Sequence, residues 1–70
     1  MTNEISLIAE QDRLVVTLRK CEAHGRKGAF AARTAERRFT RKLESAGFAP
    51  LQAYAALCDA RDVAELEAGK

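Results

Sequence analysis

The chain has 70 residues, of which 31% are charged and 47% hydrophobic, and its formal net charge is +2. A chain of this length holds one small domain with a modest core. No segment approaches the roughly 20 apolar residues of a membrane-spanning helix. The abundant Ala, Leu, Arg and Glu residues favour helices. Composition therefore predicts an all-α protein and excludes one that spans a membrane.

The two cysteines, Cys21 and Cys58, are too few for the disulfide framework of a small secreted domain. The N-terminal segment MTNEISLIAEQD is acidic and lacks the apolar run of a signal peptide. We therefore expect a cytoplasmic protein with reduced thiols and no membrane partner.

The first predicted helix spans about residues 3–24. Thr2 or Asn3 can cap its start, and Gly25 suits its end because glycine readily adopts a left-handed conformation. Its main apolar stripe recurs at spacings of four and three residues and comprises Leu7, Gln11, Leu14, Leu18 and Cys21.

A thinner apolar stripe lies on the opposite side of this first helix. Two apolar faces indicate that the helix packs against two neighbours. The thinner stripe comprises Ile5, Ala9, Val16 and Ala23.

The second predicted helix spans about residues 29–46 and follows a basic loop, HGRKG, at residues 24–28. Gly47 closes the helix, and Phe48 can fold back on it. The expected core-facing stripe comprises Ala32, Ala35, Phe39, Leu43 and Ala46.

The third predicted helix begins at Pro50 and continues to about residue 60, followed by a looser helical tail to about residue 68. Its apolar stripe meets Asp62 and breaks there, so the alternatives are a bend or a short fourth helix capped by Asp59. The expected core face comprises Leu51, Tyr54, Ala55 and Cys58.

These elements predict a single helical domain over residues 1–70, built as a helical hairpin plus a third helix. Self-association would enlarge such a small core, so we expect a homodimeric helical bundle. The residues expected to supply core and dimer packing are Leu7, Leu14, Val16, Leu18, Phe39 and Leu43.

The positive charge is concentrated in the middle of the chain. Nine of the twelve Lys and Arg residues lie between Arg19 and Lys42, where only Glu22 and Glu36 oppose them, so this window carries +7. Both ends of the chain are acidic. A concentrated field of one sign predicts adhesion to an anionic partner, although a solvated helix face is the simpler alternative.

The second helix carries arginines at intervals of four residues on the side opposite its apolar stripe. Phe30 falls among them, as an aromatic residue does at the centre of a protein interface. Alternatively, Phe30 folds onto the loop or the end of the first helix. The predicted partner-binding residues are Arg26, Lys27, Phe30, Arg33, Arg37 and Arg41.

A helix-turn-helix was tested over about twenty residues from Phe39. That motif places a small residue four positions before the turn glycine, where this chain has Leu43, and an apolar residue before that, where it has Lys42. The would-be recognition helix is Ala-rich and offers only Gln52 and Tyr54 for base contacts. Sequence-specific DNA reading is disfavoured, whereas non-specific phosphate contact stays open.

Catalytic, metal-binding and cofactor-binding patterns were not found. The chain has no glycine-rich phosphate loop, metal-binding helix motif or nucleophile elbow. Cys21, His24 and Cys58 could begin a zinc site, but Cys21 falls on the core stripe and His24 suits a helix C-terminus. We expect no metal, no cofactor and no enzymatic activity.

In size, helical organisation and Ala/Arg-rich character, the whole chain resembles the very small accessory proteins of temperate bacteriophages, among them the phage anti-activators of quorum sensing. The resemblance involves no diagnostic motif, so it assigns no role to any residue. It implies a small helical dimer in the host cytoplasm that binds and disables host regulatory proteins.

The combined hypothesis is a non-enzymatic interaction protein that binds and inhibits a host regulatory protein such as a transcription activator. The alternative is a small DNA-binding transcriptional regulator whose Arg33, Arg37 and Arg41 contact phosphates.

Overall fold

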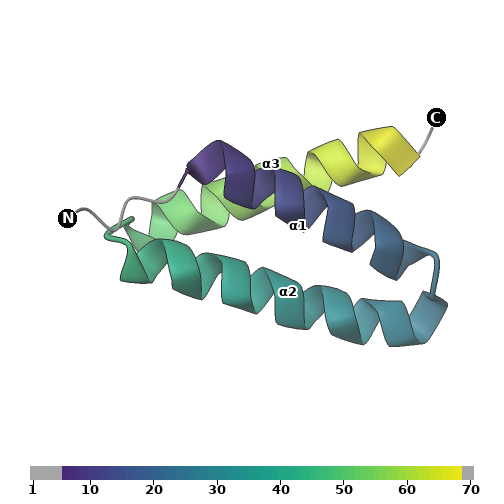
Figure 1. The fold of residues 1–70 in the computed structure, drawn as a ribbon. Helices are drawn as coiled ribbons and strands as arrows, with labels where there is room; N and C mark the ends of the chain where they lie inside the picture. The colour runs from purple at the N-terminus through teal and green to yellow at the C-terminus, as the bar shows by residue number, and fades with distance from the viewer. Residues whose placement is uncertain (1–5, 69–70) are drawn as a thin grey trace.

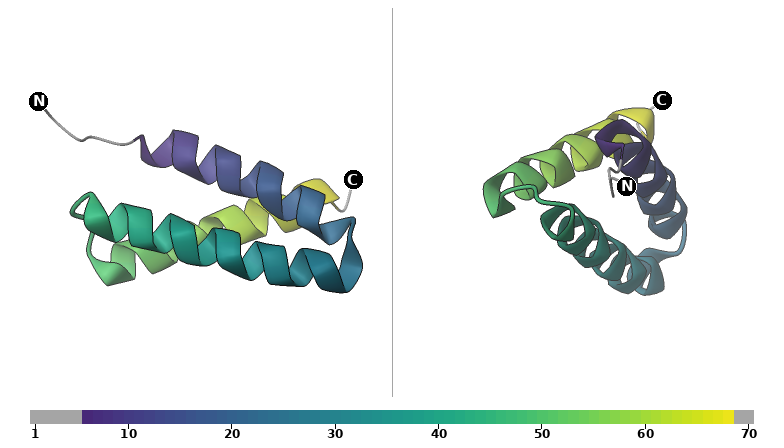
Figure 2. Two further views of the ribbon diagram at one scale, coloured as in Figure 1. Left: turned by 60° about the horizontal axis from the view of Figure 1, so that its bottom comes forward. Right: turned by 60° about the vertical axis from the view of Figure 1, so that its left-hand side comes forward.

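Three α-helices make up the computed structural model, which describes residues 6–68. They are α1 (Leu7–Glu22), α2 (Gly25–Ser45) and α3 (Pro50–Ala68). Helices α1 and α2 form an antiparallel hairpin, and α3 runs back from the far turn beside them (Figure 1). In the right-hand view of Figure 2 the three helices run along the three sides of a triangle. The predicted all-α fold, a hairpin plus a third helix, is confirmed.

Helix α1 begins after Ser6, whose Oγ accepts a hydrogen bond from the backbone N–H of Ala9 at 3.2 Å. This side chain satisfies one of the free N–H groups at the helix start. The expected caps Thr2 and Asn3 lie outside the described residues.

The predicted HGRKG loop is wrong, because α2 begins at Gly25 and includes most of that segment. The chain reverses within a very short turn, and Gly25 permits this by adopting a φ of 60°. Gly28 is buried one turn later, where a Cβ atom would overlap the carbonyl group of Cys21. The two glycines therefore allow α2 to start early and to lie close against the end of α1.

Substituting Gly28 by Ala tests this close approach. Helix propensity alone predicts that a mid-helix Gly→Ala change stabilises by about 1 kcal/mol. The overlap with the Cys21 carbonyl predicts the opposite effect, because the helices must separate to make room for the new Cβ atom. We expect the free energy of unfolding to fall by about 1–3 kcal/mol. Urea unfolding followed by circular dichroism measures the difference, and a stabilised variant would contradict the packing described above.

The turn between α2 and α3 is defined by backbone hydrogen bonds. Gly47 adopts a φ of 104°, and the N–H of Phe48 donates to the carbonyl of Leu43 at 3.0 Å. This is the pattern of a Schellman motif. The side chain of Phe48 packs on the core.

At the start of α3, Oε1 of Gln52 accepts a hydrogen bond from the backbone N–H of Ala49 at 3.0 Å, as in half of a capping box.

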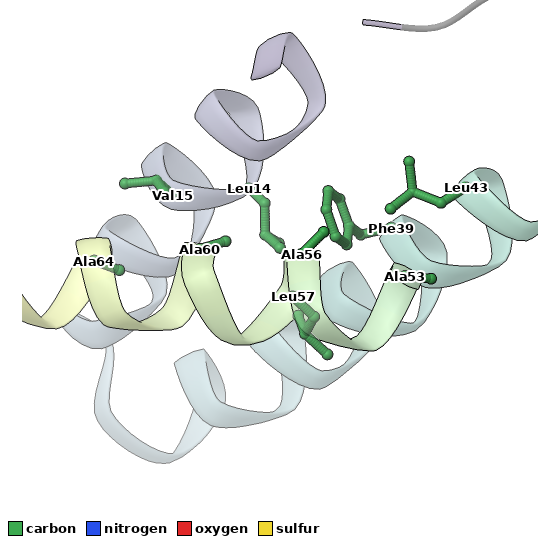
Figure 3. Close-up of a cluster of buried hydrophobic side chains, with 9 residues drawn as sticks. All are labelled: Leu14, Val15, Phe39, Leu43, Ala53, Ala56, Leu57, Ala60 and Ala64. Carbon is green, nitrogen blue, oxygen red and sulfur yellow. The ribbon is translucent and has the colours of Figure 1, made fainter. Parts of the chain in front are cut away.

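The core lies where α3 meets the hairpin. Leu14 of α1 and Phe39 of α2 point toward Ala56 of α3 (Figure 3). Leu43 is fully buried. The buried cluster comprises Leu14, Val15, Phe39, Leu43, Ala53, Ala56, Leu57, Ala60 and Ala64.

The predicted core face of α3 is wrong. Leu51 and Tyr54 are 78% and 55% exposed, and the face that is buried consists of four alanines and Leu57. Alanines allow α3 to approach the hairpin closely, which larger side chains would prevent. The predicted break or looser tail near Asp59 and Asp62 is also absent, because both aspartates lie on the exposed side and α3 continues unbroken to Ala68.

The described residues of the thinner stripe of the first helix do not pack within the bundle, and Ile5 lies outside the described residues. Val16 is 52% exposed and Ala9 and Ala23 are exposed, so Val16 is not a core residue. Helix α1 contacts both α2 and α3 through one wide face instead. Leu14 is buried in that face, and Leu7 and Leu18 pack partly buried against the core.

Candidate functional site

The outward side of α2 is the most distinctive surface of the described chain. Phe39 and Leu43 define its inner side, and Phe30, Arg37 and Arg41 lie roughly 160–200° away from Phe39 at about 100° per residue. Arg26 and Arg33, about 120–140° from Phe39 on the same scale, extend this side toward the start of α2. We call this surface the arginine face; it comprises Arg26, Phe30, Arg33, Arg37 and Arg41, all of which are exposed.

Three cations elsewhere in the described bundle, Arg19, Lys42 and Arg61, are paired across helix boundaries. Lys42 of α2 meets Glu10 of α1 at 2.9 Å, and Arg19 of α1 meets Glu67 of α3 at 3.3 Å. Each pair of helices has such a link, so these cations hold the bundle edges together.

The link between α2 and α3 is bidentate. Both Nε and Nη2 of Arg61 donate to the carboxylate of Glu36, at 2.9 and 2.8 Å. These hydrogen bonds raise the pKa of Arg61 further above its already high value. Glu36 is only 16% exposed, whereas Arg61 is 46% exposed.

No arginine of the arginine face forms an ion pair within residues 6–68. Glu36 is turned away toward Arg61, which leaves Glu44, exposed near the end of α2, as the carboxylate on this side of the helix. Unpaired, exposed guanidinium groups keep their full positive field and their hydrogen-bond donors available. The arginine face can therefore bind carboxylates or phosphates.

Phe30 lies within the arginine face and is 80% exposed. The alternative in which it folds onto the loop or the end of the first helix is wrong, because that segment belongs to α2 and directs Phe30 outward. An exposed aromatic ring between arginines offers an apolar contact in a charged surround, as interface centres do.

The structure places Lys27 apart from the other predicted partner-binding residues. Lys27 lines a shallow depression between α1 and α2, together with Lys20, Cys21 and His24. Cys58 lies on the third helix and does not join Cys21 and His24. Within residues 6–68 no group of three or more His, Cys, Asp or Glu side chains is placed to hold a metal ion.

A second surface was missed because its stripe was interpreted as core. The outward side of α3 carries exposed Leu51, Tyr54 and Ala55 and half-buried Cys58, and we call these four residues the α3 patch. The stripe itself was visible in the sequence. The direction in which the stripe faces was not visible in the sequence, because the same helix also carries an alanine face that can be buried in the core instead.

Comparisons with models of protein families, with curated proteins and with solved structures found no match to this chain. Among the described helices, none combines the length and hydrophobicity needed to cross a lipid bilayer.

Two matched substitutions test the division between paired and unpaired cations. Arg61→Met removes both hydrogen bonds to Glu36 and is expected to lower the free energy of unfolding by about 0.5–1 kcal/mol. Arg37→Met, on the arginine face, is expected to leave it unchanged within about 0.5 kcal/mol. Thermal and urea unfolding measure both variants, and an equal loss in Arg37→Met would show that the arginine face also stabilises the fold.

Proposed function

We propose that the protein is a non-enzymatic, homodimeric helical interaction protein that binds and inhibits a host regulatory protein, such as a transcription activator. The observation that carries the proposal is the division of the cations. Arg19, Lys42 and Arg61 at the helix boundaries are paired with carboxylates, whereas the cations of the arginine face are left without a partner in residues 6–68.

The chemistry of the arginine face favours an acidic protein surface as the target. Each guanidinium group can bind a carboxylate through two parallel hydrogen bonds. Phe30 adds an apolar contact that a solvated polyanion would not need. The face extends along most of the 21-residue helix α2, whose inner side is anchored by Phe39 and Leu43. Because the helix is already formed, its backbone loses little conformational entropy when it binds.

Charge reversal on the arginine face tests the proposal. In affinity purification from the host, the tagged Arg37→Glu, Arg41→Glu double variant should lose the host protein that co-purifies with the unaltered chain. Its circular dichroism spectrum should stay helical. The physical reason is that two favourable charges become repulsive toward an acidic partner.

A matched control is the Arg13→Glu, Lys20→Glu double variant, which changes the net charge equally on the exposed side of α1. Among residues 6–68, the only ion pair that it removes is the 3.6 Å contact of Arg13 with Glu10. Retention of the partner by both double variants, or its loss from both, would contradict the assignment to the arginine face.

Phosphate binding is the second candidate, because the same unpaired arginines could neutralise a nucleic-acid backbone. The outward side of α3 weighs against it. If α3 followed α2 into a groove as a recognition helix, it would present Asp59, Asp62 and Glu65 to a polyanion.

A mobility-shift series on random duplex DNA separates the two candidates. We expect no shift at low salt. A shift whose logarithmic salt dependence has a slope near −0.9 per phosphate contacted, and which Arg37→Glu, Arg41→Glu removes, would establish the DNA-binding alternative instead.

A further inference from the structure

The α3 patch lies in the longest uncharged part of the chain. Residues 45–58 contain no charged side chain, although 31% of the whole chain is charged. Leu51 is 78% exposed and Tyr54 is 55% exposed, on the side of α3 opposite its buried alanines. Large exposed apolar side chains grouped on one face mark an interaction site.

The spacing of the patch makes it complementary to itself. Its positions, 51, 54, 55 and 58, are separated by three, one and three residues, so the pattern reads the same in both directions. Two α3 helices that run antiparallel about a two-fold axis between Tyr54 and Ala55 would superimpose the patch on its own copy. Leu51 then faces Cys58, and Tyr54 faces Ala55. Each large side chain meets a small one, which allows close packing.

Charge favours the same arrangement. Antiparallel pairing places Asp59 of one copy beside the start of α3 at Pro50 in the other. Free backbone N–H groups and the positive end of the helix dipole attract a carboxylate there. Parallel pairing would instead align Asp59, Asp62 and Glu65 with their own copies, and the like charges would repel.

We infer that a second copy of this chain occupies the α3 patch, with the two α3 helices antiparallel about a two-fold axis. The inference rests on the homodimer of the proposed function but not on its partner, because the arginine face lies on another helix. About two helical turns per copy meet, so the interface falls below about 1,200 Å² in total and the dimer is weak.

Disulfide cross-linking tests the geometry directly. Leu51→Cys should form covalent dimers under mild oxidation, because antiparallel pairing brings this position opposite the native Cys58 of the other copy within disulfide reach. Adding Cys58→Ser should abolish them. Leu66→Cys, exposed on the same helix beyond the patch, is the matched control and should stay monomeric.

Three outcomes would overturn the inference. They are the absence of covalent dimer in Leu51→Cys, a covalent dimer that persists after Cys58→Ser, and equal cross-linking of Leu66→Cys. Persistence after Cys58→Ser would mean that two copies of position 51 meet, as parallel pairing requires.

Light scattering at high concentration provides an independent measurement. At about 0.5 mM, where even a small interface should associate, the unaltered chain should be dimeric. Tyr54→Glu should be monomeric with unchanged helicity, since Tyr54 is 55% exposed and lies outside the core. Phe30→Glu, on the arginine face, should remain dimeric. A monomeric unaltered chain, or a dimeric Tyr54→Glu variant, would contradict the interface.

The two proposals fail separately. If Leu51→Cys forms no covalent dimer but the Arg37→Glu, Arg41→Glu variant still loses the partner, the α3 interface alone is wrong. If Leu51→Cys does form covalent dimers but the charge reversals leave partner capture unchanged, only the function assigned to the arginine face is wrong.

Discussion

The packing of the α3 alanine face into the hairpin is the constraint on which the other features depend. Small side chains at Ala53, Ala56 and Ala60 let the α3 backbone approach Leu14 and Phe39 closely. This choice of buried side sets the rotation of α3 about its own axis. Once the alanines face inward, Leu51 and Tyr54 must face outward. The exposed apolar α3 patch is therefore a consequence of how the core is made.

The charges follow the same geometry. Carboxylates at the helix boundaries, such as Glu10 and Glu36, pair with cations from a neighbouring helix. The outward side of α2 has no neighbouring helix in the bundle, so its arginines keep their charge available. The arginine face and the α3 patch lie on different helices of the bundle. A dimer formed through α3 would thus leave α2 free for another partner.

Sequence patterns predicted a large part of this arrangement. The periodicity of α2 identified Phe39 and Leu43 as core, and the outward position of its arginines follows from the same period. The sequence was misleading where glycine or alanine decided the packing. Gly25 and Gly28 suggested a loop, yet they permit a tight reversal and a close helix contact. On α3 the larger side chains suggested the core, yet the alanines occupy it.

The sequence by itself determined the three helices, the division of α2 into an apolar and a basic side, and the concentration of positive charge in the middle of the chain. Those features depend on local periodicity and composition, which need no knowledge of neighbours. Only the tertiary structure decided which side of α3 is buried, that Val16 faces outward, and which cations are paired. Each of these depends on how closely two helices approach, and that distance is set by side chains far apart in the chain.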